Sequence, residues 1–176
     1  IADLFLDDIY NRIRIRHSEL YIQFVFIPGN HDCDFTSPLN NVRSTLLKSP
    51  ALDMDDPDSM ELCIGIQSEY LKFIKKWSEN NLAAINKDNC IFTEYTIKNQ
   101  ILGNYNIRIH CINTAWDLLL KEVKNKKLKL PDGIEYKKDN DIIITLMHHG
   151  EEWLGYEGNQ NWNEYYKQYS DIILVG

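Results

Sequence analysis

Two features that mark membrane and secreted proteins are absent from this sequence of 176 residues. No apolar run approaches the roughly 18 residues that a membrane span needs, and the N-terminus lacks the basic-then-apolar order of a signal peptide. The four cysteines show no C-x-x-C spacing, which argues against a zinc cage or a disulfide framework. We therefore predict no membrane contact and a reducing, cytoplasmic setting.

Glycine, proline and positive charge are also scarce. With 8 Gly, 5 Pro, 44% hydrophobic and 26% charged residues, the composition is that of a soluble globular protein and excludes a fibrous or disordered one. The net charge of -7 argues against a surface that binds nucleic acid through clustered Lys and Arg alone. A phosphate substrate stays open, because bound divalent cations reverse the local charge of a site.

Hydrophobic periodicity predicts one α/β domain in which helices alternate with buried strands. The length allows one well-cored domain and not two of ordinary size. The chain begins within a helical pattern and stops at the strand pattern "DIILVG", so we expect a fragment truncated at both ends. The predicted strands are 19–27, 90–97, 105–113, 141–147 and 171–176, and the predicted helices are 1–15, 37–48 with Ser37 as N-cap, 68–79 and 161–170. We expect strands 90–97 and 105–113 to be antiparallel neighbours, 49–60 to be an acidic loop, and 121–141 to be a charged connection on the surface.

Polar, metal-competent side chains follow two of these strands. The run "FVFIPGNHDCD" leads from an apolar strand into Asn30, His31 and Asp32, and the strand 141–147 leads into His148 and His149. Ligand sites in open α/β sheets gather outside the carboxyl ends of the strands. We therefore expect these five side chains to be neighbours in space, although an ordinary turn is the alternative for "PGNHD".

The blocks "PGNHD" and "HHG", together with the terminal "DIILVG", resemble the calcineurin-like metallophosphoesterase family. That family carries D-x-H, G-D, G-N-H-D or G-N-H-E, a strand-ending His, and G-H-x-H in this order. The chain contains the third and fourth blocks and stops at what resembles the glycine of the fifth. The resemblance implies a four-layered α/β/β/α sandwich, incomplete at both ends, with 1–176 as a partial domain and a cap or insertion over about 37–90.

The resemblance also implies a chemistry. Two divalent ions, such as Mn, Fe or Zn, would neutralise the oxygens of a phosphate ester and supply a metal-bound hydroxide. Asn30 and His148 would be metal ligands, and His31 would lie beside the phosphate, to stabilise charge or protonate the leaving oxygen. Asp32 would orient either its loop or the imidazole of His31.

Two further residues are substrate-pocket candidates by the same resemblance. His149 would flank the substrate, although Gly150 stands where many family members have proline, which weakens the register of the two histidines. Trp116, in "NTAW", would wall the pocket, and a core or loop-packing tryptophan is the alternative. Trp153 has the same ambiguity, and we expect His110 to be a packed or edge residue of its strand.

The sequence therefore predicts a metal-dependent phosphoesterase that acts on a phosphomonoester or phosphodiester. The substrate is a phosphate ester of unknown identity, with nucleotides and nucleic acids included. Because only two of the usual metal ligands are present, we expect the isolated chain to bind metal weakly and to be a poor catalyst. The alternative is a catalytically degenerate member that binds protein partners, although intact Asn30, His31 and His148 argue against it.

Overall fold

A five-stranded mixed sheet forms the centre of the computed structural model, which describes residues 2–20, 22–49, 52–53, 55–78, 84–88, 91–98, 105–119, 128, 130 and 141–176. The strands lie in chain order: β1 Ala84–Asp88, β2 Phe92–Lys98, β3 Asn106–Ile112, β4 Asp141–Met147 and β5 Ile172–Val175. Strands β1, β2 and β3 pair antiparallel, whereas β3, β4 and β5 pair parallel. The predicted α/β class is confirmed.

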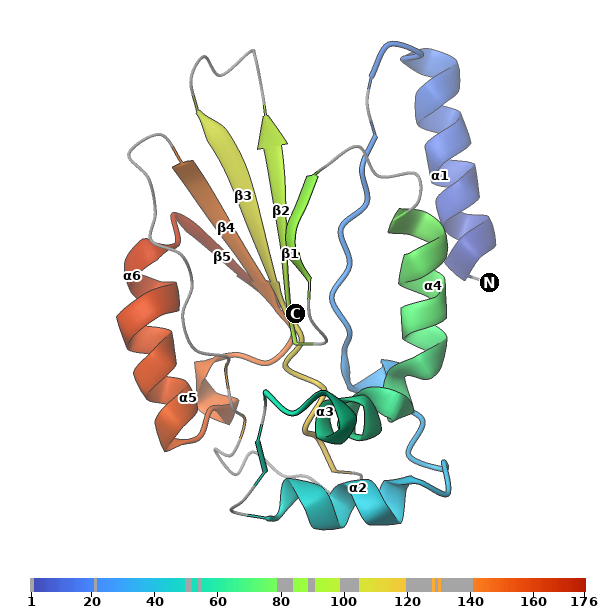
Figure 1. The fold of residues 1–176 in the computed structure, drawn as a ribbon. Coiled ribbons are helices and arrows are strands. Elements are labelled where there is room, and N and C mark those ends of the chain that lie inside the picture. The colour runs from blue at the N-terminus through green and yellow to red at the C-terminus, as the bar shows by residue number, and fades with distance from the viewer. Residues whose placement is uncertain are drawn as a thin grey trace.

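Helices flank this sheet on both sides (Figure 1). Helices α1 (Ala2–Arg16) and α4 (Ser68–Ser78) lie on one side, and α5 (Tyr156–Asn161) and α6 (Lys167–Tyr169) lie on the other. A π-helical segment, Trp162–Tyr166, joins α5 to α6, while α2 (Asn40–Leu47) and α3 (Pro57–Ile64) lie beyond the end of the sheet that carries the chain's C-terminus. Within the described part of the chain, no helix is both long and apolar enough to span a membrane.

Several elements follow the sequence pattern closely. Strand β4 has the predicted bounds, and its odd-numbered residues, from Asp141 to Met147, are all buried, so one complete face lies in the core. The antiparallel pairing of β2 with β3 is also confirmed, as are the helices α1 and α4 to within one or two residues. Residue 79, the predicted end of α4, lies outside the described residues.

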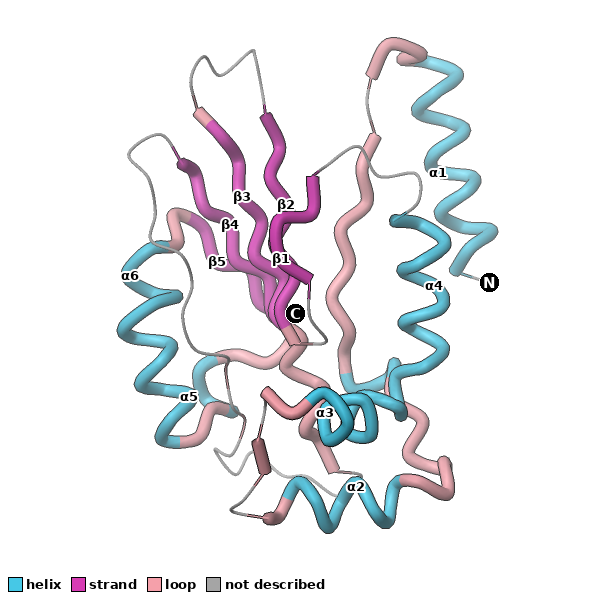
Figure 2. The backbone as a smooth tube through the Cα atoms, in the orientation of Figure 1, coloured by secondary structure: helices cyan, strands magenta, loops and turns pink. Residues whose placement is uncertain are grey.

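The predicted strand at 19–27 is wrong. Residues 22–29 run as an extended loop that has no ladder pairing with any described strand, and Figure 2 draws this segment between the sheet and α4. Its apolar side chains pack on a helix instead: the Phe24 ring meets Trp77 edge-on at 5.2 Å, and the Phe26 ring meets Phe73 at 5.0 Å. The apolar run therefore indicates partial burial of this segment, but it does not indicate pairing within the sheet.

Three further boundaries differ from the predictions. Ser37 is not an N-cap, because α2 begins at Asn40 and Leu39 occupies the cap position. The stretch read as an acidic loop contains α3, whose first turn is capped by Asp56, which accepts a hydrogen bond from the Ser59 backbone N–H at 3.0 Å. The last helix begins five residues early, at Tyr156, since the glycines of "LGYEGN" conceal its start.

Strand β5 was predicted to be buried, but it is an edge strand of the sheet, and Leu174 is 54% exposed. The main core lies between the α5–α6 region and the face of the sheet that carries Met147. Ile112, Met147 and Tyr166 are fully buried there. Most of the predicted surface connection at 121–141 lies outside the described residues. Its Leu128 belongs to this core, contrary to the expectation of a wholly surface segment.

The described residues form one sheet, so the second sheet of a four-layered sandwich is not seen among them.

Candidate functional site

Two hydrogen bonds join the first and last residues of the "GNHD" loop, Gly29 and Asp32. The Asp32 carboxylate accepts a hydrogen bond from the Gly29 backbone N–H at 2.8 Å, and the Asp32 backbone N–H donates to the Gly29 carbonyl at 3.1 Å. These bonds bend Asn30–Asp32 into one short 3-10 turn, and the side chains of Asn30 and His31 are exposed. Of the two roles predicted for Asp32, this contact favours orientation of the loop.

His148 follows the last residue of β4 and lies between two glycines. A Cβ atom built on Gly29 would lie 3.1–3.2 Å from three atoms of the His148 ring, and one built on Gly176 would lie 2.9 Å from its Nδ1. A side chain at either position would therefore crowd the His148 ring, most of all at Gly176. Nε2 of His148 lies 3.3 Å from Oδ1 of Asn30, although 118 residues separate the two in the chain.

His149 is buried, with only 5% of the residue exposed. Its backbone N–H donates to the hydroxyl of Thr114 at 2.9 Å, and its Nδ1 lies 3.0 Å from the same hydroxyl. Its ring meets the His148 ring edge-on at 4.6 Å and packs on Trp153 at 5.0 Å. Burial and the neighbouring His148 lower the pKa of His149 to about 4, so its ring is neutral at pH 7.

The loop after β3 supports both motif loops, which the sequence did not predict. The side-chain amides of Asn113 and Gln67 exchange two hydrogen bonds, at 2.7 and 3.2 Å, and Gln67 Nε2 also approaches the Cys33 sulfur at 3.6 Å. Thr114 holds His149, as described above. The polar pair Asn113 and Thr114, which directly follows a strand in "NTAW", could have indicated this role. The sequence prediction named only Trp116 of that stretch.

Trp116 is fully buried against Met60, Cys63, Ile64 and Ile91. Its carbonyl accepts a hydrogen bond from the buried Arg43 at 2.5 Å. This placement favours the core alternative that the sequence left open.

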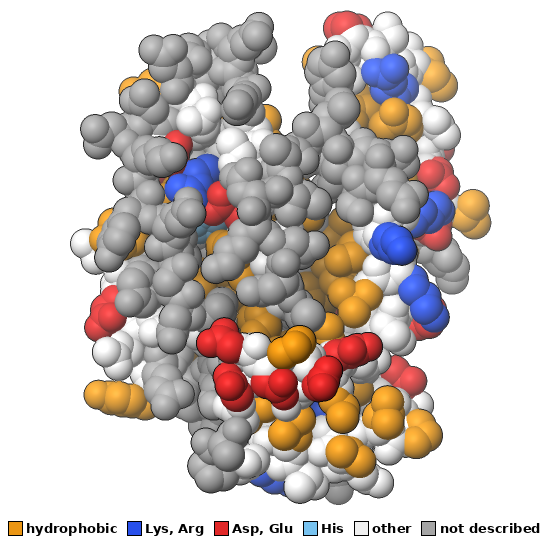
Figure 3. Space-filling view, in the orientation of Figure 1, with side chains coloured by type: hydrophobic (Ala, Val, Ile, Leu, Met, Phe, Trp, Pro, Cys, Tyr) orange, Lys and Arg blue, Asp and Glu red, His pale blue; other side chains and the backbone are white. Residues whose placement is uncertain are grey.

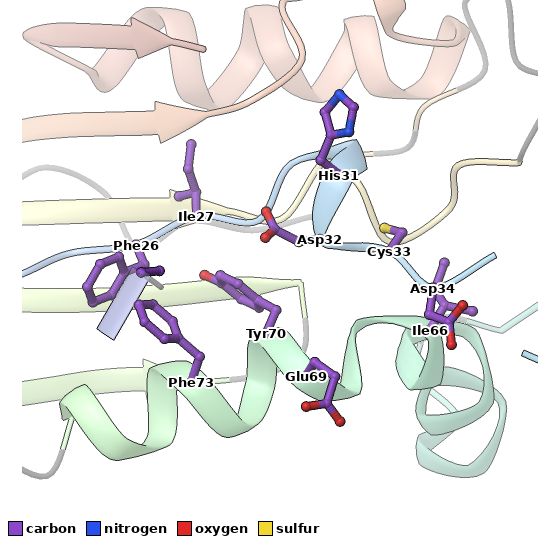
Figure 4. A pocket seen from close by; sticks show the side chains of 11 residues that line it. Phe26, Ile27, His31, Asp32, Cys33, Asp34, Ile66, Glu69, Tyr70 and Phe73 are labelled. Atoms are coloured by element: carbon purple, nitrogen blue, oxygen red, sulfur yellow. The ribbon is translucent and has the colours of Figure 1, made fainter. Parts of the chain in front are cut away.

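A cavity of about 510 Å³ adjoins the "GNHD" loop, and His31 and Asp32 are among the residues that line it. Phe26, Tyr70 and Phe73 form an aromatic wall of this cavity (Figure 4). In Figure 4 the His31 side chain points away from these aromatic rings. Neither Trp116 nor His149 lines this cavity.

The Asn30 and His148 side chains fit a divalent cation. An amide oxygen and an imidazole nitrogen are both metal ligands, and a separation of 3.3 Å lets both reach one ion with bonds of about 2.0–2.2 Å. Within the described residues, no three or more His, Cys, Asp or Glu side chains form a group that could hold a metal ion. The five predicted site residues lie near the carboxyl end of β4, and Asn30 and His148 are in contact. The five are Asn30, His31, Asp32, His148 and His149.

Comparison with known proteins gives one match. The family model described as calcineurin-like phosphoesterase matches residues 2–176, which is nearly the whole chain. No curated protein and no solved structure matches the chain. Proteins of this family are hydrolases of phosphate esters and typically use divalent metal ions. From its motifs, its α/β fold and this match, the chain belongs to the calcineurin-like phosphoesterase family.

Proposed function

We propose that this chain carries part of a metal-dependent phosphoesterase site that hydrolyses a phosphomonoester or phosphodiester. The observation that carries the proposal is the contact between Asn30 Oδ1 and His148 Nε2, two ligand atoms brought together from distant segments. The glycines at 29 and 176 support it, because they leave the space that the His148 ring occupies.

In this proposal Asn30 and His148 hold one divalent cation, of the Mn, Fe or Zn type. Cations bound there would supply Lewis-acid neutralisation of the ester's oxygens. His31 is exposed on the same loop and lies beside the phosphate, where its imidazole stabilises negative charge or donates a proton to the leaving oxygen. Asp32 keeps the loop in shape through its bond to Gly29.

The substrate is a small phosphate ester in preference to a nucleic acid. Figure 3 shows acidic side chains gathered over α3, in a stretch whose exposed acidic residues are Asp53, Asp55, Asp58 and Glu61. Such a surface repels a long polyanion. This stretch belongs to the predicted cap at about 37–90. Because α4 and β1 belong to the layers of the main sheet (Figure 1), we propose that the part of this segment around α2 and α3 sets the choice of substrate.

The complete domain is proposed to be a four-layered sandwich in a reducing, cytoplasmic setting. Ile142, Ile144 and Leu146, on the second face of β4, are only half-buried, and Leu174 of β5 is exposed. An apolar face of this kind is suited to packing against a second sheet. The isolated chain then holds two of the metal ligands that the family uses, so it binds cations weakly and turns over slowly.

Titration of the isotope-labelled chain with Mn²⁺ tests the metal site, because a bound paramagnetic ion broadens the NMR signals of nearby nuclei even when binding is weak. We expect selective broadening at the Asn30 side-chain amide and the His148 ring. His148→Ala should abolish the effect at Asn30, while the matched variant His17→Ala should leave it unchanged, because His17 is an exposed histidine that follows α1.

If Mn²⁺ broadens neither signal, the metal site is absent and the catalytically degenerate alternative is favoured. Tight, stoichiometric binding of two ions by the isolated chain would contradict the expected weakness. In a protein that contains this chain together with the remaining ligands, His31→Ala should keep the metal and lower the rate about 100-fold or more. An unchanged rate would refute the role of His31.

A further inference from the structure

We infer that Thr114 is a positioning residue of this site: its hydroxyl fixes His149 in the Nε2–H tautomer and holds the ring against which His148 packs. The inference deepens the proposed function and rests on it for its catalytic meaning. Its geometry stands independently.

The argument begins with a buried hydroxyl that must be satisfied. Thr114 is fully buried, and its Oγ1 contacts two groups, the backbone N–H and the Nδ1 of His149. No other partner of Oγ1 is found among the described residues. The backbone N–H can only donate, so the hydroxyl proton of Thr114 has a single acceptor available, which is Nδ1.

This acceptor determines the tautomer. If Nδ1 carried the proton, both contacts would donate to Oγ1, and the hydroxyl proton would be buried without an acceptor, at a cost of the kind that folded proteins avoid. Nδ1 is therefore unprotonated, which excludes the charged ring as well as the other tautomer, and the single ring proton of His149 lies on Nε2. That nitrogen has no partner among the described residues and is not one of their fully buried polar atoms, so it is open to an acceptor.

The loop that carries Thr114 is itself held in place. The Asn113 backbone N–H donates to the Ile91 carbonyl at 2.8 Å, and the Asn113 side-chain oxygen accepts from the Ala115 backbone N–H at 3.1 Å. Thr114 therefore does not adjust freely to His149. The contacts run from Thr114 to the His149 ring, from there to the perpendicular His148 ring, and on to Asn30.

The result is a neutral N–H donor on the ring that packs against His148, and the proposed function puts an anionic phosphate near the cation that His148 would hold. An imidazole that can only donate from Nε2 suits an oxygen that can only accept. Outer groups that orient a metal ligand typically change affinity or activity by about 10-fold to 100-fold when they are removed. We expect Thr114 to act in this range.

The test is the pair of ring nitrogen chemical shifts of His149, measured at pH 7 in the isotope-labelled chain of 176 residues. We expect a pyrrole-type Nε2 and a pyridine-type Nδ1 in the natural chain and in Thr114→Ser, which keeps the hydroxyl. Thr114→Val should move both shifts toward a mixture of tautomers. Its matched control is Thr145→Val, which removes another fully buried hydroxyl, bonded at 2.6 Å to Ser170 instead of to His149.

Mn²⁺ broadening at Asn30 and His148 provides the second measurement. Thr114→Val should raise the apparent Kd for Mn²⁺ about 10-fold, and Thr114→Ser should restore it. A protonated Nδ1 in the natural chain, or unchanged nitrogen shifts in Thr114→Val, overturns the inference. If the nitrogen shifts behave as expected but Mn²⁺ broadens nothing, the proposed function fails and the tautomer assignment stands.

Discussion

The sheet satisfies its buried polar groups in two different ways. At the carboxyl ends of β3 and β4, where the candidate site lies, neutral groups do this: the amide pair of Asn113 and Gln67, and the hydroxyl of Thr114. Toward the amino ends of the same strands, formal charges are paired. Arg108 bonds to Glu94 at 2.5 Å and to Asp141 at 3.2 Å, and all three side chains are at most 7% exposed.

We infer that the charged end serves mainly to hold the sheet together, whereas the neutral end supports the candidate site. Burial disfavours the charge of Arg108, but its hydrogen bonds to Glu94 and Asp141 outweigh burial and raise its pKa, so Arg108 stays charged. The ion pairs of Arg108 with Glu94 and Asp141 connect three neighbouring strands, which favours one register of the sheet. At the other end, the neutral groups leave the proposed ligand atoms of Asn30 and His148 facing each other at the surface.

The largest expected effect comes from breaking the charged end. Arg108→Leu leaves two buried carboxylates without their shared counter-charge, so the free energy of unfolding should fall by about 3–5 kcal/mol. Urea unfolding measures it. The matched variant Arg12→Leu removes an arginine from an exposed pair with Asp8, and it should cause no measurable change. Equal effects of the two variants would contradict the comparison.

The stability of the chain should depend on pH through His149, at the carboxyl end of β4. The pKa of His149 lies near 4 in the folded chain and at its ordinary value of 6.5 when unfolded. Between these values the unfolded chain binds a proton that the folded chain does not, so stability is full above pH 6.5 and falls as the pH falls toward 4. The loss should be about 3 kcal/mol at most.

Urea unfolding at pH 7 and at pH 4.5 measures this loss. The variant His149→Gln isolates the contribution of His149 from that of the carboxyl groups. If the natural chain and the variant lose the same stability on acidification, His149 does not remain neutral in the folded state.

A smaller effect is expected from the amide pair. Asn113→Ala leaves the buried Gln67 amide without its reciprocal partner and should destabilise the chain by about 1–3 kcal/mol. Gln67→Met alone should cost a similar amount. The double variant should cost less than the sum of the two, because neither amide is then orphaned. Strict additivity in urea unfolding would show that the two side chains are not coupled.

The smallest effect on stability is expected at Asn30, the exposed residue that we propose as a metal ligand. Asn30→Ala should change the free energy of unfolding by no more than about 0.5 kcal/mol, because the side chain is exposed. The same substitution should abolish Mn²⁺ broadening at the His148 ring. If Asn30→Ala destabilises the chain as much as Arg108→Leu, the inferred difference between the charged end and the candidate site is wrong.

Much of the fold was predictable because its elements carry local patterns. Strand β4 is a continuous apolar run, and α4 has apolar residues at helical spacing, so both were predicted closely. The prediction failed where local pattern and tertiary pairing differ. Residues 22–27 have the composition of a strand, but they pack their phenylalanines on α4 and pair with no described strand.

The residues of the site divide in the same way. The sequence by itself determined the two motif loops, "GNHD" and "HHG", because each places ligand-competent side chains directly after an apolar run, and it determined the family through them. Only the tertiary structure decided that Asn30 meets His148, that Trp116 belongs to the core, and that Thr114 and Asn113 support the loops. These contacts join residues far apart in the chain, and local sequence carries no signal for a hydrogen bond that only folding creates.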